Sequence, residues 1–214
     1  MTARIMTLIL MGGLAQLLPS QIMKKKNKID TAGKGSILAA RLFAEASLIA
    51  AEVFLVRTET DLLSFLILSL ILMLSAVIII IDTRCRIIPN LCLFPMLLLC
   101  AGYLARRIAL GESWTRIPSG IVSMIIMCAL LMSLTSVLHF QGSLGAGDIK
   151  FLSVAAFLFT LSSRMTGLLI GLVISMAAYL IPMLLMKKIT MKSMIAFGPF
   201  IGFGLMGGIC WLYL

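Results

Sequence analysis

Charged residues are scarce in this chain, and acidic residues are the scarcest. Only 12% of its 214 residues are charged, and eight are Asp or Glu against eighteen Lys or Arg. Soluble domains carry about 25% charged residues. The low share of charge here, together with the mean hydropathy of +1.14, excludes a soluble domain. Helices satisfy their own backbone hydrogen bonds in hydrocarbon. We therefore expect an all-α polytopic membrane protein.

Residues that commonly bind metal ions are also few. His139 is the only histidine, and the five cysteines include no CxxC pair. Structural zinc sites and disulfide frameworks need closely spaced pairs. We therefore predict no metal and no cofactor, and interpret the cysteines as small apolar packing residues.

Hydrophobic runs account for most of the chain. A helix needs about 20 residues to cross a bilayer, and eight runs approach or reach this length: 3–23, 36–56, 62–81, 90–105, 118–138, 149–161, 164–186 and 195–213. The sixth is short, so the alternatives are eight crossing helices or seven plus one re-entrant helix. The first resembles a retained anchor more than a cleaved signal, because its positive cluster follows the run. No linker or repeat divides the chain, so residues 1–214 are expected to form one membrane domain.

The net charge of +10 would suggest nucleic acid in a soluble chain, but here the basic residues lie mostly between hydrophobic runs. There they set orientation, with Lys and Arg enriched on the cytoplasmic side. We therefore predict the lipid bilayer as a partner and no nucleic acid. If the runs alternate and the loop KKKNKIDTAGK is cytoplasmic, that side carries eleven basic residues and the other side six. Asp82 and Asp148 then share the cytoplasmic face.

These two aspartates are the strongest indication of function. Asp82 stands in IDTRCRIIPN and Asp148 in LGAGDIK, each where a hydrophobic run meets the membrane boundary. Carboxylates near hydrocarbon are costly and are rarely kept without a partner or a task. Two carboxylates with unequal protonation and a water molecule between them are the minimum for aspartic proteolysis.

The neighbouring residues suggest how each aspartate is used. Gly145 and Gly147 are expected to adopt torsions closed to other residues and to allow close approach to Asp148. Lys150 completes this supporting loop. Asp148 starts a run, where a helix dipole favours a carboxylate, whereas Asp82 ends one, where the dipole favours the protonated acid. We therefore expect Asp148 to activate water and Asp82 to supply the proton.

Three segments, in this order, resemble the type IV prepilin peptidases, the leader peptidases of the GxGD aspartic class. IDTRCRIIPN is similar to the first catalytic segment, LGAGDIKFLSVAAF to the second, and IAFGPFIGFG to the FGP segment that opens the last helix. The resemblance covers about residues 36 to 213. It implies catalysis by Asp82 and Asp148 without a cofactor, and a prepilin or pseudopilin helix as partner. The resemblance also implies that the basic leader of this substrate is cut at the cytoplasmic face of the bacterial inner membrane.

Three acidic or basic side chains lie inside the second run. Arg41, Glu45 and Glu52 share one face of a helix. One interpretation is a polar wall on the substrate side, with Glu45 corresponding to a glutamate of the family. The other is an ion pair between Arg41 and Glu45 that stabilises helix packing.

Other classes remain as alternatives. A presenilin-like protease has the same dyad, but its last helix opens with a PAL segment where this chain has AFGPF. An archaeal preflagellin-type peptidase shares the chemistry. A small transporter or membrane scaffold would use the aspartates as an ion or proton relay, or not at all.

The interval between the first two runs departs from the bifunctional members of the resembled family. Those members carry a large domain with two CxxC pairs there and methylate the new N-terminus, whereas this chain has only KKKNKIDTAGK. We predict that the purified protein transfers no methyl group to a cleaved pilin. Incorporation of a labelled methyl group by this chain alone would contradict the prediction.

Overall fold

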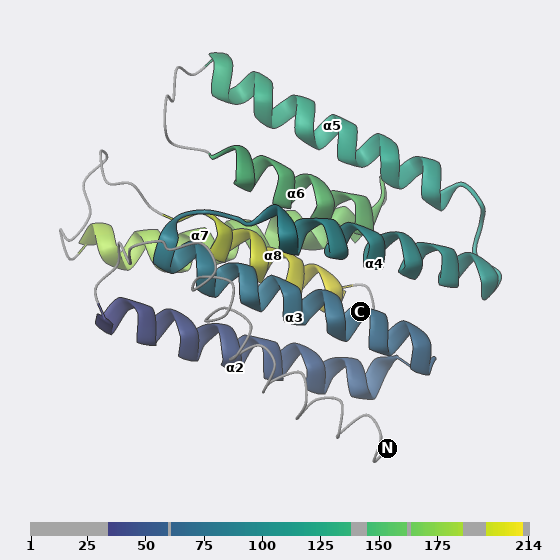
Figure 1. Ribbon diagram of the computed structural model, residues 1–214, viewed down its shortest axis with the longest axis horizontal. Coiled ribbons are helices and arrows are strands. Elements are labelled where there is room, and N and C mark those ends of the chain that lie inside the picture. Colours follow the sequence, from purple (N-terminus) through teal and green to yellow (C-terminus); the bar gives the residue numbers. More distant parts are fainter. Residues whose placement is uncertain (1–33, 60, 138–144, 162–163, 186–195, 212–214) are drawn as a thin grey trace.

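The protein is all-helical over the residues that its structure describes. The computed structural model describes residues 34–59, 61–137, 145–161, 164–185 and 196–211, which form seven helices and no strand (Figure 1). The helices are α2 (Lys34–Thr58), α3 (Leu62–Cys85), α4 (Asn90–Ala109), α5 (Arg116–Val137), α6 (Ala146–Phe159), α7 (Arg164–Leu185) and α8 (Gly198–Trp211). Each of the last seven predicted runs therefore corresponds to one helix. The predicted run 3–23 lies outside the described residues.

Helix α3 forms the centre of the bundle. It starts at its N-cap Asp61, whose side chain accepts a hydrogen bond from the Ser64 N–H (2.9 Å). Its apolar side chains are buried along most of its length, and it packs against α2, α4 and α8. The helix continues to Cys85, four residues beyond the predicted end, so Asp82 lies inside its last turn.

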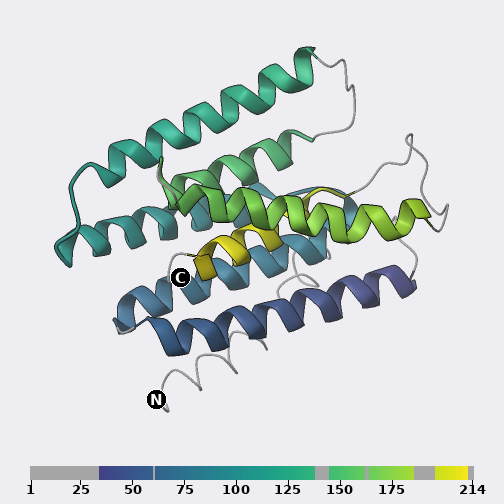
Figure 2. The ribbon, with the colours of Figure 1, turned by 180° about the vertical axis from the view of Figure 1, so that it is seen from behind.

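Helices α6 and α8 are short and lie among the longer ones (Figures 1 and 2). Each has 14 residues, which corresponds to about 21 Å of helix against a hydrocarbon thickness of about 30 Å. From Phe151 to Phe159, α6 is buried throughout, and it packs chiefly against α5 and α4. Segments of this kind are stable at membrane depth when protein covers them.

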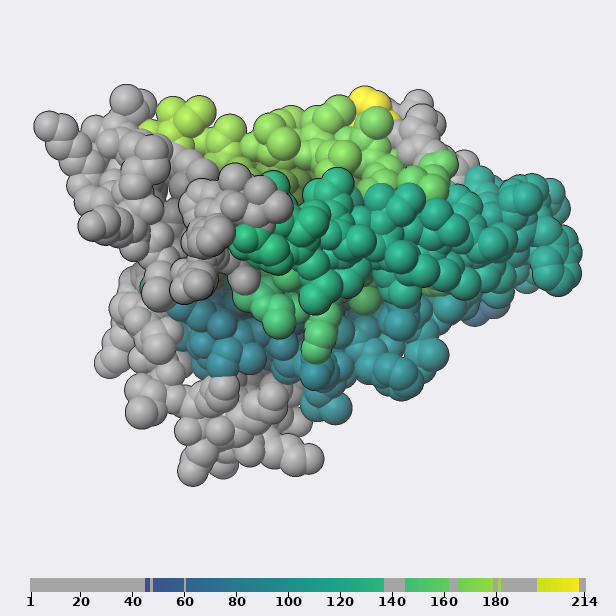
Figure 3. Space-filling model, turned by 90° about the horizontal axis from the view of Figure 1, so that it is seen from above, coloured from purple at the N-terminus to yellow at the C-terminus, as the bar shows by residue number. Residues whose placement is uncertain are grey.

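Among the described residues, three helices are long and apolar enough to cross a membrane, namely α3, α4 and α5. In the view of Figure 3, α5 lies across the face of the molecule in front of α6. Its outer surface exposes apolar side chains: Ile121, Val122, Ile125, Ile126, Leu130, Met132 and Leu134. Such a surface is stable in contact with lipid and not with water. The polytopic membrane fold expected from composition is thus confirmed.

The cysteines of the chain are free thiols. Cys85, Cys92 and Cys100 are buried, and Cys92 and Cys100 belong to the hydrophobic core. They are located in α3 and α4, where small apolar side chains allow close helix packing.

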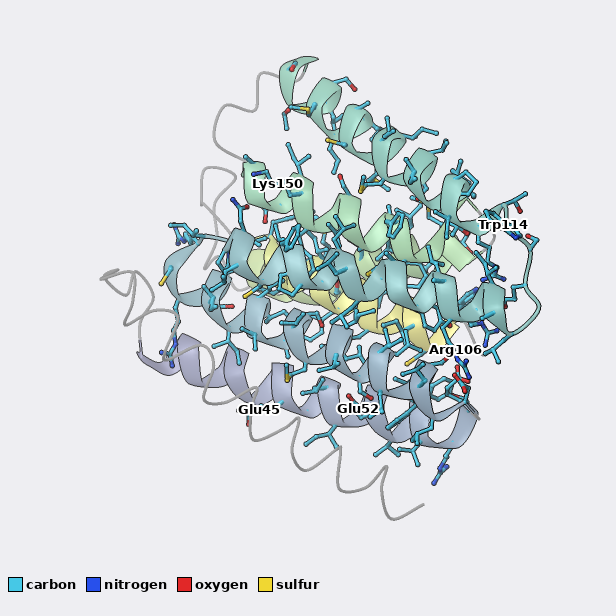
Figure 4. The ribbon with its side chains drawn as sticks, turned by 45° about the vertical axis from the view of Figure 1, so that its right-hand side comes forward. Glu45, Glu52, Arg106, Trp114 and Lys150 are labelled. Atoms are coloured by element: carbon cyan, nitrogen blue, oxygen red, sulfur yellow. The ribbon has the colours of Figure 1, made fainter. Side chains whose placement is uncertain are left out.

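A network of ion pairs joins the α2–α3 connection to the end of α4. Arg106 donates from Nε and Nη2 to Asp61 Oδ2 (3.0 Å) and Oδ1 (2.8 Å). Arg107 and Arg116 both pair with Glu112, each at 2.7 Å. Figure 4 shows Arg106 and Trp114 at one end of the molecule and Lys150 toward the other. The two connections are thereby held together at the end that lies away from Asp148.

The pair of Asp61 and Arg106 generates a prediction for stability against pH. The hydrogen bond from Arg106 lowers the pKa of Asp61 below its usual range. A depressed carboxyl pKa stabilises the fold above the unfolded value of about 3.9, and this contribution is lost as the pH falls below it. Asp61→Asn keeps a good N-cap but removes the charge. We expect it to lower the Tm by roughly 1–3 °C at pH 7, and the difference from wild type to shrink below about pH 4.

Thermal unfolding in detergent between pH 3 and 7 measures this difference. Ser113→Ala is the control, because Ser113 is exposed in the same region and its hydroxyl group hydrogen-bonds only to that of Thr115 among the described residues. Equal unfolding temperatures for Asp61→Asn and wild type at pH 7 would show that the ion pair contributes nothing.

Candidate active site

Asp82 is a carboxylic acid buried in a helical bundle. It is only 4% exposed, and it lies in the last turn of α3. The helix ends just after it at Arg86, which adopts the left-handed conformation (φ 50°, ψ 41°) and donates its N–H to the Asp82 carbonyl oxygen (2.7 Å). This conformation turns the chain sharply. Ile88 and Pro89 are consequently folded back into the protein, where both are buried.

Asp148 is the third residue of α6, and its side chain caps its own helix. The Gly145 N–H donates to Asp148 Oδ2 (3.0 Å), and the Asp148 N–H donates to the Gly145 carbonyl oxygen (3.0 Å). This is one half of a capping box; the other half needs a side chain that glycine lacks. The contact orients the half-buried carboxyl group of Asp148 at the start of the helix.

A contact between Gly147 and Ile88 brings the two aspartate segments together. A Cβ atom on Gly147 would lie 3.0 Å from Ile88 Cβ, closer than such atoms normally approach. Glycine therefore lets the first turn of α6 rest on the α3–α4 connection. Asp148 is then close enough to interact electrostatically with Asp82, although no hydrogen bond between described atoms joins the two carboxyl groups.

The role that we predicted for the glycine torsions is wrong. Gly145 has φ −76° and ψ 150°, which any residue adopts, and Gly111 is the only glycine with positive φ in the described part of the chain. What the site requires of Gly147 is the absence of a side chain. The predicted close approach is therefore present, but its partner is Ile88.

The first turn of α8 also reaches the site. The Gly198 N–H donates to Asp82 Oδ2 (2.9 Å) in a buried hydrogen bond. Our sequence analysis had noted Gly198 only within the FGP resemblance and had not placed it beside Asp82. The available signal was that resemblance, because nothing in the local sequence pairs residues 116 positions apart.

The helix-dipole distinction between the two aspartates leaves out a second helix, α8. It assumed that Asp82 meets only the C-terminal end of its own helix. In the structure, the N-terminal end of α8 faces Asp82 through Gly198, just as the N-terminal end of α6 carries Asp148. Both carboxyl groups therefore face the positive end of a helix dipole, and the dipoles do not assign the proton.

Two exposed basic side chains of the described residues lie at this end of the bundle. Lys150 is exposed at the start of α6 (Figure 4). Arg86 is also exposed, yet its guanidinium is close enough to interact electrostatically with Asp82.

The acidic residues of α2 lie elsewhere. Glu52 is 1% exposed and accepts a hydrogen bond from Ser69 on α3 (2.7 Å). Ser69 and Asp82 are thirteen residues apart, which is about 20 Å along a helix. Figure 4 shows Glu52 directed toward α3 and Glu45, which is half-buried, on the outer side of α2. The side chain of Arg41, and hence its predicted pair with Glu45, lies outside what the structure describes.

No group of three His, Cys, Asp or Glu side chains within the described ranges is arranged to hold a metal ion. His139 lies outside those ranges. The carboxyl groups that the structure brings close together at this end are those of Asp82 and Asp148.

The fold and this site define a class: an all-helical membrane protein with two interacting carboxyl groups near one end of the bundle. The sequence profile of the type IV leader peptidase family matches residues 65–182, which is more than half of the chain. The protein belongs to this family. The match includes both aspartates but is narrower than the expected 36 to 213, since it excludes α8. Neither the curated proteins nor the solved structures gave a match.

The contact at Gly147 generates a prediction. Gly147→Ala places a methyl group 3.0 Å from Ile88 Cβ and must push α6 away from the α3–α4 connection. Overpacking of this kind costs about 1–3 kcal/mol, so we expect a lower unfolding temperature. Gly102→Ala is the matched control, because a methyl group there meets no atom within 4 Å and alanine favours the helix by about 0.5–1 kcal/mol.

Thermal unfolding of the two variants in detergent checks this expectation. A Gly147→Ala protein that unfolds at or above the temperature of Gly102→Ala would contradict the close packing between α6 and the connection.

Proposed function

We propose that the protein is a membrane-embedded aspartic endopeptidase that removes the short basic leader from type IV prepilins or pseudopilins. The observation that carries the proposal is that the contact of Gly147 with Ile88 brings Asp148 beside the end of the helix that carries Asp82, 66 positions earlier in the sequence. Buried carboxyl groups that influence one another are the acid–base equipment of aspartic proteolysis. Membership of the type IV leader peptidase family supports the substrate class.

The reaction needs one ionised and one protonated carboxyl group. The ionised group takes a proton from a water molecule as the water oxygen attacks the carbonyl carbon of the scissile peptide bond. The protonated group gives its proton to the carbonyl oxygen, which yields a tetrahedral diol. Collapse of the diol breaks the C–N bond, and a proton passes to the leaving amine. The two carboxyl groups exchange roles, and their proton belongs to the pair.

The active site is proposed to face the cytoplasm. Arg106, Arg107 and Arg116 form ion pairs at the opposite end of the bundle. These are three of the six basic residues assigned to the outer side, against eleven on the side of Asp82 and Asp148, and the side with more Lys and Arg is normally the cytoplasmic one. Trp114 at that outer end is 81% exposed, as is common for tryptophan at a membrane interface.

We further propose that residues 1–214 act as one domain in the bacterial inner membrane. One hydrophobic core, shared by all seven described helices, supports this interpretation. The leader of a substrate would then meet the enzyme in the cytoplasm while its hydrophobic helix stays in the bilayer. The cleavage site of such a substrate lies at the boundary between the cytoplasm and the bilayer. The carboxyl pair at one end of the bundle is proposed to meet the scissile bond at that boundary.

Coexpression with a prepilin tests the proposal. Wild-type protein is expected to convert the prepilin to its shorter form, and Asp82→Asn and Asp148→Asn are each expected to reduce conversion at least a thousandfold, because asparagine keeps the shape and removes the titrating proton. This loss corresponds to about 4 kcal/mol of transition-state stabilisation. Asp61→Asn, the same substitution at the opposite end of the bundle, is expected to cut normally.

Immunoblots of membranes measure both the substrate shift and the amount of each variant. Cleavage by both aspartate variants would overturn the aspartic mechanism. Failure of the wild type on several prepilins would overturn the substrate assignment, and a relay in a transporter would become the better interpretation.

A further inference from the structure

The first turn of α8 presents a single backbone donor to Asp82. The Phe200 N–H is already bonded to the Phe197 carbonyl oxygen (3.1 Å), and Pro199 has no N–H. Residues at the start of a helix have N–H groups without partners inside the helix. The Gly198 N–H is such a group, and its 2.9 Å hydrogen bond to Asp82 Oδ2 satisfies both the donor and the buried carboxyl group.

Only glycine fits at this position. A Cβ atom on residue 198 would lie 2.7 Å from Asp82 Oδ2, 2.9 Å from its Cγ and 3.0 Å from its Cβ. The constraint is steric, because Gly198 is not among the described glycines with positive φ. The backbone of α8 therefore packs directly against the carboxyl group.

A second contact on the same two helices sets this approach. A Cβ atom on Gly202 would lie 2.5 Å from Ile79 Cδ1. Gly202 is one turn beyond Gly198 on α8, and Ile79 is one turn before Asp82 on α3. The two antiparallel helices thus touch at successive turns, and this register places the Gly198 N–H opposite Asp82.

The two carboxyl groups are held in the same way. Oδ2 of Asp82 accepts from the Gly198 N–H and Oδ2 of Asp148 accepts from the Gly145 N–H. No other hydrogen bond to either carboxyl group involves the described part of the chain. Each aspartate consequently has one oxygen bound to a glycine amide, while no described group donates a hydrogen bond to its other oxygen.

We propose that Gly198 is a positioning residue for the peptidase reaction: its N–H holds Oδ2 of Asp82, so that Oδ1 is the oxygen that carries the proton or contacts the attacking water. The inference rests on the proposed catalytic role of Asp82. It gives α8 a role in the reaction, although α8 lies outside residues 65–182, which match the family profile. Misplacement of a reacting group by about 1 Å can reduce the rate about a hundredfold.

Kinetics of three alanine variants test the proposal. Gly198→Ala must displace the Asp82 carboxyl group, and we expect kcat to fall about a hundredfold with a smaller change in KM, because the proposal assigns Gly198 to the reacting carboxyl group. Gly202→Ala separates the same helices without touching Asp82, and we expect a lower Tm with a much smaller loss of kcat. Gly207→Ala meets only Gly171 Cα at 3.6 Å and should behave as wild type.

A Gly198→Ala enzyme with wild-type kcat would overturn the proposal. So would a loss of kcat that Gly202→Ala reproduces at an equal loss of Tm, because helix packing alone would then explain it. Wild-type protein that cleaves no prepilin would instead refute the proposed function, and activity in Asp82→Asn would refute the dyad. These failures are therefore distinguishable.

A spectroscopic measurement keeps the test valid if Gly198→Ala does not fold. Labelling Phe carbonyl carbons with ¹³C and Gly nitrogens with ¹⁵N selects only Phe–Gly peptide bonds, and the chain has two, at Gly198 and Gly204. Asp82→Ala is expected to shift the Gly198 amide proton and to leave that of Gly204, in the interior of α8, unchanged. A Gly198 signal that does not respond would show that the hydrogen bond is absent.

Discussion

The burial of Asp82 in an apolar bundle is the constraint on which the site depends. A carboxyl group removed from water is costly unless donors replace the lost hydration. The replacement here is the Gly198 N–H, and it is available only because α8 starts at that residue and has no side chain there. The start of α8 at Gly198 and the absence of a side chain there thus serve one requirement, namely a backbone donor in contact with a buried acid.

The helices could be predicted because each is an apolar run bounded by polar or turn-forming residues. Seven of the eight predicted runs correspond to helices, and most of their ends agree to within three residues. The two larger errors, of four residues each, are at the ends of α3 and α4, and the one at α3 has a physical cause. Hydropathy falls at Asp82, but the helix continues until Arg86 adopts the left-handed conformation. The end of an apolar run marks where the chain leaves the apolar environment, whereas the end of a helix marks where its backbone hydrogen bonds stop. The two positions need not coincide.

The site was predicted less completely than the fold. Asp82 and Asp148 could be singled out because acids are rare in this chain and stand at the ends of apolar runs. Gly198 could not be placed beside Asp82, since that contact depends on the register of α8 against α3. Glu52 illustrates a second limit. Its helical face allowed a polar wall on the substrate side as one interpretation, and the structure hydrogen-bonds it to Ser69, thirteen residues before Asp82 on α3. The helical period of the sequence shows which residues of α2 share a face. It does not show which residues of α3 that face meets, because that depends on how the two helices pack.

The two ends of the bundle are stabilised by different interactions. At the end that carries Arg106, the charged pairs of Asp61 with Arg106 and Glu112 with Arg116 join two connections and tolerate contact with water. At the other end, the hydrogen bonds that the described residues give to Asp82 and Asp148 come from glycine amides, and Gly147 packs against Ile88. Backbone amides donate hydrogen bonds without a net charge. They can therefore orient two acids without forming the tight ion pair that would keep a carboxylate from exchanging its proton.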